Sequence, residues 1–422
     1  MFKLDVGILT IGDELTSGMI QDTNSSFMSR QLNSEGWHVS AIMSVGDDET
    51  DIKKGLEYLL EISDAVIVTG GLGPTSDDKT TASMAKAFGL KLYTDDSVLD
   101  AIKKRFEKFR IQWTDNNAKQ AMFPEGAATI LNPVGTAWGF YLKKDGKIVA
   151  VIPGVPFEVK RMFPEGVIPL FRKEFKGPVQ YSSKRTIKLF GISEAKVDEA
   201  LSGEEFEIPG VAIGFYPRFP ENHLVITSKG DDKETSTGNL KVIEEKIIER
   251  LEKYIFGYDN ETLEGIVASL LTKKNLTLSV AESCTGGLIT DRLTDIPGSS
   301  KFLDRGVVTY SNISKMEILG VSSSILDEHG AVSEQTSVSM AEGVRKLGKT
   351  NIGLAVTGIA GPTGGTAEKP VGTVFIAVTD GSDTVCRKFL FRWERRRVKE
   401  ISSQWSLEIL RRFLVRYSDS DR

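Results

Sequence analysis

The sequence predicts an α/β protein of several domains, and three observations support this fold class. Its 422 residues are too many for one core, because domains usually hold roughly 100–200 residues, so we expect about two to four domains. Apolar runs of strand length alternate with amphipathic helical patterns over residues 4–152, which is typical of a mostly parallel sheet. The same alternation begins again near residue 260.

The N-terminal region supplies the first set of predicted elements. We predict strands over 4–11, 38–44, 65–69 and 147–152 and helices over 24–34 and 49–62. Three of these strands run into glycine-rich loops, at Gly12, at Gly70-Gly71-Leu72-Gly73 and at Pro153-Gly154. Open α/β sheets bind ligands beyond the carboxyl ends of their strands, so we expect a ligand site at these loops.

The middle region predicts a small α+β module. We predict strands over 185–190, 211–216 and 224–228 and helices over 193–201 and 235–254. In the second helix Leu240, Ile243, Ile247 and Leu251 recur every three or four residues, so they should face the core. KH domains, which bind RNA, are of similar size and build, but residues 180–255 contain no Gly-x-x-Gly loop. We therefore favour a structural spacer over a nucleic-acid-binding module.

The C-terminal region returns to alternating strands and helices. We predict strands over 276–281, 352–356, 371–379 and 384–391 and helices over 262–273, 285–294, 312–319, 334–347 and 395–415. The last two predicted strands are expected to pair with each other at the end of the domain. The region is therefore expected to form a second α/β domain.

Composition narrows the chemistry that the chain can perform. The net charge of −5 offers no overall field that would attract nucleic acid. Two cysteines and three histidines cannot supply a disulfide framework or a four-cysteine zinc site, so catalysis must use carboxylates, hydroxyls, lysine or backbone amides. No stretch approaches the ~20 apolar residues of a membrane helix, and the first residues lack a signal-peptide core. We expect a cytoplasmic location.

Ser283 lies between a predicted strand and a predicted helix in the C-terminal region. A hydroxyl there faces the amides at the start of the 285–294 helix, which stabilise negative charge. A serine nucleophile without histidine needs another base, and a buried lysine such as Lys315 can serve. The alternative is that Ser283 only caps the helix and Lys315 is a solvated surface amine.

Cys284 is the rival nucleophile in this segment. Adjacent side chains of an extended chain point to opposite faces, so Ser283 and Cys284 should not share one pocket, and a buried structural thiol is the commoner state. The loop from Thr357 to Gly365 could hold a phosphate through its backbone amides. Glycine-rich turns also follow strands for purely structural reasons, so that alternative stays open.

Four carboxylates stand out in the N-terminal region. Asp13 and Glu14 follow the first strand, and Asp77 and Asp78 lie in the loop after Thr69. If these loops converge, the carboxylates could hold Mg²⁺ or a similar cation beside a pyrophosphate. The alternative is an Asp-rich turn with a helix N-cap at Asp78 or Thr80.

Eight short motifs occur in order along the chain. The N-terminal four are Gly12-Asp13-Glu14-Leu15-x-x-Gly18, Thr69-Gly70-Gly71-Leu72-Gly73-Pro74-Thr75-x-Asp77-Asp78, Asn132-Pro133-Val134-Gly135-Thr136-Ala137 and Pro153-Gly154-Val155-Pro156-x-Glu158. The C-terminal four are Ala281 to Gly287, Tyr310-Ser311-Asn312-x-x-Lys315, Gly330-Ala331-Val332-Ser333 and Thr357-Gly358-Ile359-Ala360-Gly361-Pro362. Together they resemble the CinA family over essentially the whole chain.

The resemblance implies three domains and two activities. It places a doubly wound molybdopterin-binding-like domain over 1–172, a KH-like spacer over 178–256 and an amidase domain over 260–418. The first domain would be a metal-dependent ADP-ribose pyrophosphatase. The last would hydrolyse nicotinamide mononucleotide to nicotinate mononucleotide and ammonia, as in pyridine-nucleotide salvage. These nucleotides would be the ligands of a homodimer that binds neither nucleic acid nor membrane.

The resemblance also implies roles for individual residues. Ser283 and Lys315 would form the catalytic pair, with Tyr310 and Thr285 beside them. The substrate phosphate would be held by Thr357, Gly358, Gly361 and Arg395. In the first domain a divalent metal of the Mg or Co type would be held by Asp13, Glu14, Asp77 and Asp78, and Gly70, Gly71 and Gly73 would admit a diphosphate. The amidase site would need no metal.

Two segments depart from the family pattern. The chain has Trp393-Glu394-Arg395 where many relatives have Gly-Asp-Arg. Arg395 therefore keeps the positive charge for a substrate phosphate, but the bulky Trp393 is expected to change the shape of the loop. Trp138 stands where relatives often have proline, and its ring is expected to narrow the N-terminal pocket. The alternative function is an N-terminal half that binds a pterin or nucleotide without turnover and reports its level.

Overall fold

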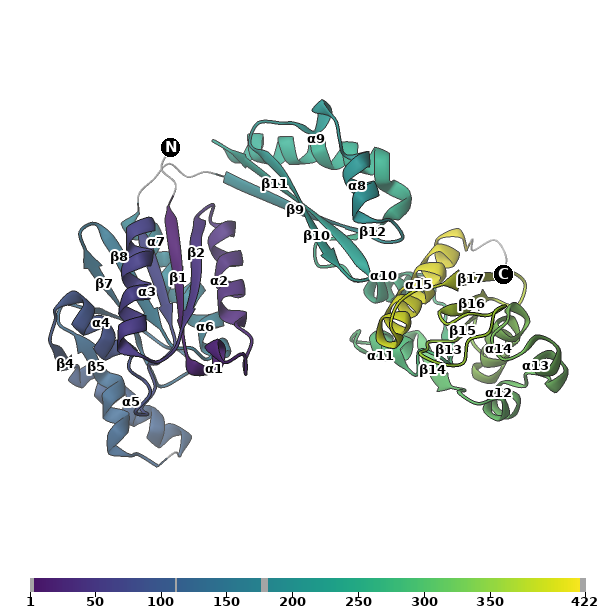
Figure 1. The fold of residues 1–422 in the computed structure, drawn as a ribbon, viewed down its shortest axis with the longest axis horizontal. Coiled ribbons are helices and arrows are strands. Elements are labelled where there is room, and N and C mark those ends of the chain that lie inside the picture. The colour runs from purple at the N-terminus through teal and green to yellow at the C-terminus, as the bar shows by residue number, and fades with distance from the viewer. Residues whose placement is uncertain (1–3, 111, 176–180, 418–422) are drawn as a thin grey trace. The chain divides into compact units, whose positions relative to one another are not determined.

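The computed structural model describes residues 4–110, 112–175 and 181–417, and Figure 1 traces their helices and strands. The chain divides into two compact units, residues 1–182 with 229–236 and residues 183–228 with 237–422. The predicted domain limits at residues 1, 178 and 418 lie outside the described residues. The α/β class is confirmed: the first unit has a doubly wound sheet, and the second has an α+β module followed by another α/β sheet.

The first unit is built on a six-stranded sheet of order β2-β1-β3-β8-β7-β6. Its strands are β1 Asp5–Ile11, β2 His38–Val45, β3 Ala65–Thr69, β6 Ala128–Ile130, β7 Gly139–Lys144 and β8 Lys147–Ile152. Its helices are α1 Asp13–Thr16, α2 Thr23–Ser34, α3 Glu49–Ile62, α4 Thr80–Phe88, α5 Asp96–Phe109, α6 Pro156–Met162 and α7 Ile168–Glu174. The short strands β4 Leu92–Thr94 and β5 Met122–Pro124 pair separately.

Both faces of this sheet are buried, because successive side chains of a strand point to opposite faces. In β3, Val66 and Val68 join the core beneath α3 and α5, whereas Ala65 and Ile67 join the core beneath α2 and α6. β1, β3 and β8 are parallel neighbours, so the three glycine-rich loops that follow them leave the same edge. The expected meeting of these loops is confirmed.

Most of the predicted spacer module belongs to the second unit. Its elements are β9 Tyr181–Leu189, α8 Glu194–Ala200, β10 Val211–Arg218, β11 Glu221–Gly230, α9 Lys233–Leu251 and β12 Ile255–Tyr258. The strands form a sheet of order β10-β11-β9-β12. The four apolar residues predicted to face the core from α9 are all buried in this module. A period of three to four residues thus identified the inner face of the helix.

The rest of the second unit is a five-stranded sheet of order β14-β13-β15-β16-β17. Its strands are β13 Leu278–Glu282, β14 Leu303–Val308, β15 Ile352–Gly358, β16 Thr373–Thr379 and β17 Thr384–Leu390. Its helices are α10 Leu263–Lys273, α11 Leu288–Thr294, α12 Asn312–Leu319, α13 Ser323–His329, α14 Glu334–Gly348 and α15 Arg395–Arg416. Helices α10, α11 and α15 bury one face of the sheet, and α12 to α14 bury the other (Figure 1).

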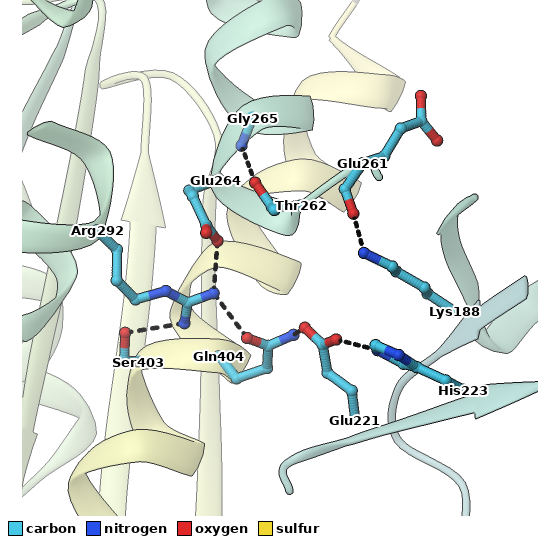
Figure 2. A network of polar contacts seen from close by, with 10 residues as sticks. All are labelled: Lys188, Glu221, His223, Glu261, Thr262, Glu264, Gly265, Arg292, Ser403 and Gln404. Atoms are coloured by element: carbon cyan, nitrogen blue, oxygen red, sulfur yellow. Dashed lines mark hydrogen bonds and ion pairs between the residues drawn. The ribbon is translucent and has the colours of Figure 1, made fainter. Parts of the chain in front are cut away.

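The spacer and the C-terminal domain share buried contacts within the second unit. Phe190 at the end of β9 belongs to the core of the C-terminal domain, and its ring centroid lies 4.7 Å from that of Trp405 in α15. Figure 2 shows the polar contacts nearby, in which Gln404 of α15 donates to Glu221 of β11 at 2.8 Å. None of the helices in the described part of the chain has the length and apolar character that crossing a bilayer requires.

Candidate functional sites

Ser283 follows directly after β13, at the carboxyl edge of the parallel strands. Its backbone amide donates to the carbonyl of Val356 in the neighbouring strand β15, at 3.0 Å. This bond fixes the backbone at the start of the turn. Ser283 itself is 7% exposed. The serine hydroxyl is therefore presented from a rigid turn at the edge where α/β sheets bind ligands.

Lys315 reaches this turn from the first turns of α12. The helix begins at a capping box, in which the Ser311 hydroxyl accepts from the amide of Ser314 and the Ser314 hydroxyl accepts from the amide of Ser311. The Lys315 Nζ atom lies 3.2 Å from Ser283 Oγ. It also donates to the carbonyl oxygens of Thr309, at 2.8 Å, and Tyr310, at 3.3 Å. The two residues predicted as a catalytic pair are thus brought into hydrogen-bond contact.

The environment of Lys315 favours the neutral amine. The residue is 1% exposed, and burial lowers its pKa from the ordinary 10.5 because the charged form loses its hydration. A neutral amine has two N–H groups, and two carbonyl oxygens are present to accept them. Its lone pair is then left for the hydroxyl proton of Ser283. This is the arrangement that a general base requires.

Glu282 stabilises this turn, and no role was predicted for it. Its side chain is fully buried, and its carboxylate accepts from the amides of Gly287 at 3.0 Å, Ile289 at 3.2 Å and Thr290 at 2.8 Å. The first amides of α11 are therefore occupied by this carboxylate. The signal in the sequence was an acidic residue that ends an apolar strand immediately before the predicted nucleophile.

The contacts of Glu282 correct the predicted oxyanion site. The expected helix over 285–294 begins only at Leu288, and its first amides do not face Ser283 because Glu282 binds them. Among the described residues, the amides of Thr285 and Gly286 donate to no acceptor. The Thr285 hydroxyl is also buried without a partner. Thr285 is fully buried, whereas Gly286 is exposed, and an unpaired buried donor such as the Thr285 hydroxyl is rare. This turn therefore offers free donors to a developing negative charge.

Cys284 is unsuited to act as the nucleophile. Its side chain is 4% exposed, and burial raises the pKa of the thiol to about 12. Near neutral pH the reactive thiolate is therefore scarce. A Cβ atom at Gly358 would lie 3.1 Å from the Cys284 sulfur, so the thiol fills space beneath the end of β15.

Arg395 joins the segment before α12 to the second glycine-rich loop. Its guanidinium donates to the carbonyl of Gly361 at 2.8 Å and to the phenol oxygen of Tyr310 at 3.0 Å. The Tyr310 side chain is 61% exposed, so its ring remains open to a ligand. The Thr357 hydroxyl is instead occupied internally, because it donates to the carbonyl of Ala331 at 2.7 Å.

A cavity of about 490 Å³ in the first unit is lined by the three glycine-rich loops. Gly70 and Gly71 have φ of 113° and 63°, values that other residues rarely adopt. A Cβ atom would lie 2.2 Å from the carbonyl oxygen of Ile11 at Gly70 and 2.3 Å from Thr80 Oγ1 at Gly71. Only glycine lets this loop lie so close to its neighbours, which supports its predicted role in admitting a ligand.

Two of the four predicted metal-binding carboxylates line this cavity, Glu14 and Asp78. Asp78 also accepts from the amide of Thr75 at 2.9 Å. Asp13 lies outside the lining and exchanges backbone-to-carboxylate hydrogen bonds with Asp47, at 3.0 and 3.1 Å. Asp77 also lies outside it. Across the described ranges, no group of three or more His, Cys, Asp or Glu side chains is arranged to hold a metal by itself.

Glu158 lines the cavity together with Glu14, Asp22 and Asp78, and no role was predicted for it. It accepts from the Asn132 amide at 3.0 Å, and burial raises its pKa above 4.5. Its place within the Pro153–Glu158 motif was the available signal. The expectation that Trp138 narrows this pocket is wrong, because its ring packs against the core beneath α3 to α5 while Thr136 and Ala137 line the cavity.

Three family descriptions match successive parts of the chain. Residues 7–173 match the probable molybdopterin binding domain, residues 184–257 match the damage-inducible protein CinA KH domain, and residues 260–414 match the CinA C-terminal domain. A CinA-like protein of Syntrophus aciditrophicus is 58% identical over 97% of this chain and 98% of its own length. A CinA-like protein of Geotalea uraniireducens is 42% identical over 98% of both chains.

One of the similar solved structures covers about a third of this chain. It is the competence/damage inducible protein CihA of Agrobacterium tumefaciens, which is 40% identical and covers 36% of this chain and 96% of its own, with a TM-score of 0.35.

Proposed function

Because this chain belongs to the CinA family, we propose that its C-terminal domain hydrolyses nicotinamide mononucleotide to nicotinate mononucleotide and ammonia. The observation that carries the proposal is the 3.2 Å contact between Lys315 Nζ and Ser283 Oγ. A buried lysine in contact with a serine forms a nucleophile and base without histidine. Nicotinamide mononucleotide also carries a phosphate, and the positive charge of Arg395 would attract that phosphate.

In the proposed reaction, Ser283 is the nucleophile and Lys315 is the base. Ser283 Oγ attacks the carboxamide carbon while Lys315 accepts the hydroxyl proton. Lys315 then returns that proton to the leaving ammonia, and an acyl-enzyme ester is formed on Ser283. Water attacks the ester in a second step, again with Lys315 as base, and releases nicotinate mononucleotide. The amides of Thr285 and Gly286, with the Thr285 hydroxyl, stabilise the oxyanion of both tetrahedral intermediates.

The rest of the substrate would lie between Tyr310 and the Thr357–Gly361 loop. Arg395 contacts both of these elements, so its charge is available to the ribose phosphate. The exposed ring of Tyr310 can flank the pyridinium ring, which is a cation and favours an aromatic face. The backbone at Gly358 and Gly361 would complete the phosphate site.

The direct test is to incubate pure protein with nicotinamide mononucleotide, with and without a chelator, and to measure ammonia and nicotinate mononucleotide. We expect turnover that the chelator does not change, because the proposed steps use only Ser283, Lys315 and backbone amides. Loss of activity on chelation would contradict a metal-independent mechanism. Absence of turnover under both conditions would reject the substrate.

The rate should rise with pH if Lys315 is the base. Below its pKa the lysine is an ammonium and cannot accept the serine proton, so kcat/KM should fall about tenfold per pH unit on the acid side. Since burial lowers the pKa of Lys315 below 10.5, the plateau should begin below that pH. The measurement is kcat/KM for nicotinamide mononucleotide over roughly pH 5–9. A profile that falls with rising pH would contradict the assignment.

For the first unit we propose metal-dependent hydrolysis of the diphosphate of ADP-ribose, giving AMP and ribose 5-phosphate. Glu14 and Asp78 offer the hard oxygen ligands that Mg²⁺ or Co²⁺ takes, and Mg²⁺ usually binds one or two carboxylates together with substrate phosphates. When bound, such an ion supplies neutralisation of the diphosphate and an activated water. Gly70, Gly71 and Gly73 would let the backbone approach the diphosphate, and Glu158, which also lines the cavity, would accept a proton from water.

Asp78→Ala is expected to abolish metal-dependent release of AMP from ADP-ribose. The substitution removes one of two predicted metal-binding carboxylates that line the cavity, whereas Asp77→Ala should cost less because Asp77 lies outside the lining. Asp100→Ala, on the exposed side of α5, is the matched control. AMP release is measured by chromatography with and without Mg²⁺. Tight binding of ADP-ribose without turnover in the unaltered protein would instead favour a nucleotide sensor.

A further inference from the structure

The hairpin of the spacer, formed by β10 and β11, contacts the C-terminal domain next to Arg395. Phe219 lies at the turn of this hairpin, and its ring centroid is 5.5 Å from that of Trp393, with the planes at 67°. The Arg397 guanidinium lies over both rings, 4.9 Å from the Phe219 centroid and 5.2 Å from the Trp393 centroid. The bulky residue that departs from the family pattern is therefore in contact with the spacer.

The residues that the hairpin contacts are close in sequence to Arg395, which belongs to the proposed phosphate site. Trp393 and Arg397 stand two residues before and two residues after Arg395, which begins α15. One turn further along the same helix, Lys399 Nζ lies 3.7 Å from the position that a Cβ atom at Gly286 would take. The first turn of α15 thus lies between the spacer hairpin and the catalytic turn.

A second set of contacts joins the same hairpin to α11 (Figure 2). Glu221 of β11 accepts from the Gln404 amide at 2.8 Å, and the Gln404 carbonyl accepts from Arg292 at 2.8 Å. Arg292 belongs to α11 and is also bound to Glu264 at 2.7 Å. The hairpin therefore contacts α15 directly and is linked to α11 through Gln404.

We infer that the β10–β11 hairpin positions the substrate-binding end of the amidase site, with Phe219 acting through Trp393 and Arg397 on Arg395. The inference rests on the proposed function, because it assigns Arg395 to the phosphate of nicotinamide mononucleotide. Phe219 is a positioning residue, since its own contacts are with Trp393 and Arg397. The spacer is thereby part of the machinery that recognises the nucleotide, in addition to its place between the two α/β domains.

The test compares Phe219→Ala with the unaltered full-length protein. We expect KM for nicotinamide mononucleotide to rise roughly three- to tenfold, as loss of one aromatic and one cation–π contact would allow, while kcat stays nearly constant. For nicotinamide riboside, which lacks the phosphate, we expect no change in KM or, if it is not turned over, in its inhibition constant. In an Arg395→Ala background, Phe219→Ala should have no further effect.

Two variants serve as controls for folding and for the loss of any aromatic side chain. Phe219→Trp keeps an aromatic ring at the hairpin turn, so its KM should stay close to that of the unaltered protein. Tyr216→Ala removes an exposed ring from β10 and should leave KM unchanged. Equal losses on both substrates, an unchanged KM, or a fall in kcat alone would overturn the inference. Failure of the unaltered protein to hydrolyse nicotinamide mononucleotide would reject the proposed function itself.

Discussion

Ser283→Ala is expected to lower ammonia release from nicotinamide mononucleotide by roughly four orders of magnitude or more, as loss of a nucleophile does in serine hydrolases. Ser283 is the hydroxyl that the structure places in contact with a base. The Thr285 hydroxyl is buried without a partner and cannot replace it, because Lys315 contacts Ser283. The measurement is single-turnover and steady-state ammonia release, with thermal unfolding recorded to show that the variant is folded.

Cys284→Ala is the matched variant for this prediction. The thiol is buried, and its pKa is raised to about 12, so its removal should change kcat by less than about threefold, with only a small packing defect. The comparison separates two adjacent side chains of similar size. If Cys284→Ala is inactive while Ser283→Ala still turns over, the nucleophile assignment is wrong.

Lys315→Arg is expected to be as inactive as Lys315→Met, with both variants at least about 10²–10⁴-fold below the unaltered protein. Lysine with a lowered pKa can accept a proton, whereas arginine stays protonated at any working pH. Methionine removes both charge and base while it preserves an unbranched side chain in the buried site. The measurement is kcat for ammonia release near neutral pH.

The arginine variant distinguishes a base from a mere cation. If Lys315 only supplied positive charge to Ser283 or to the substrate, Lys315→Arg would retain most of the activity and Lys315→Met would not. Equal loss in both variants, together with unchanged thermal unfolding, supports proton transfer. Retained activity in Lys315→Met would exclude a catalytic role for this side chain.

Much of the fold was predictable because its signals are local. The strands of the first unit appear as short apolar runs, and the leucines and isoleucines of α9 recur with a period near 3.6, so both signals lie in short windows. The glycine-rich ends of β1, β3 and β8 also predicted that their loops lie at one edge of the sheet, since parallel neighbouring strands end together. The pairing of Ser283 with Lys315 came from family motifs rather than from spacing.

The acidic residues show where local reasoning was insufficient. Sequence proximity grouped Asp13 with Glu14 and Asp77 with Asp78, yet only one member of each pair lines the cavity. Glu158, far along the chain, joins them there. Which of two adjacent side chains points inward depends on loop geometry, and that geometry depends on contacts such as Asp13 with Asp47.

The sequence was enough to establish the α/β class, the order of elements and the residue types available for catalysis, because each of these is encoded in neighbouring positions. The three-dimensional fold was needed to show that Glu282 occupies the first amides of α11, that Lys315 is buried, and that a hairpin of the spacer contacts the helix of Arg395. Each of these depends on desolvation or on atoms from distant segments. Burial and long-range contact are properties of the packed chain, so no local pattern could express them.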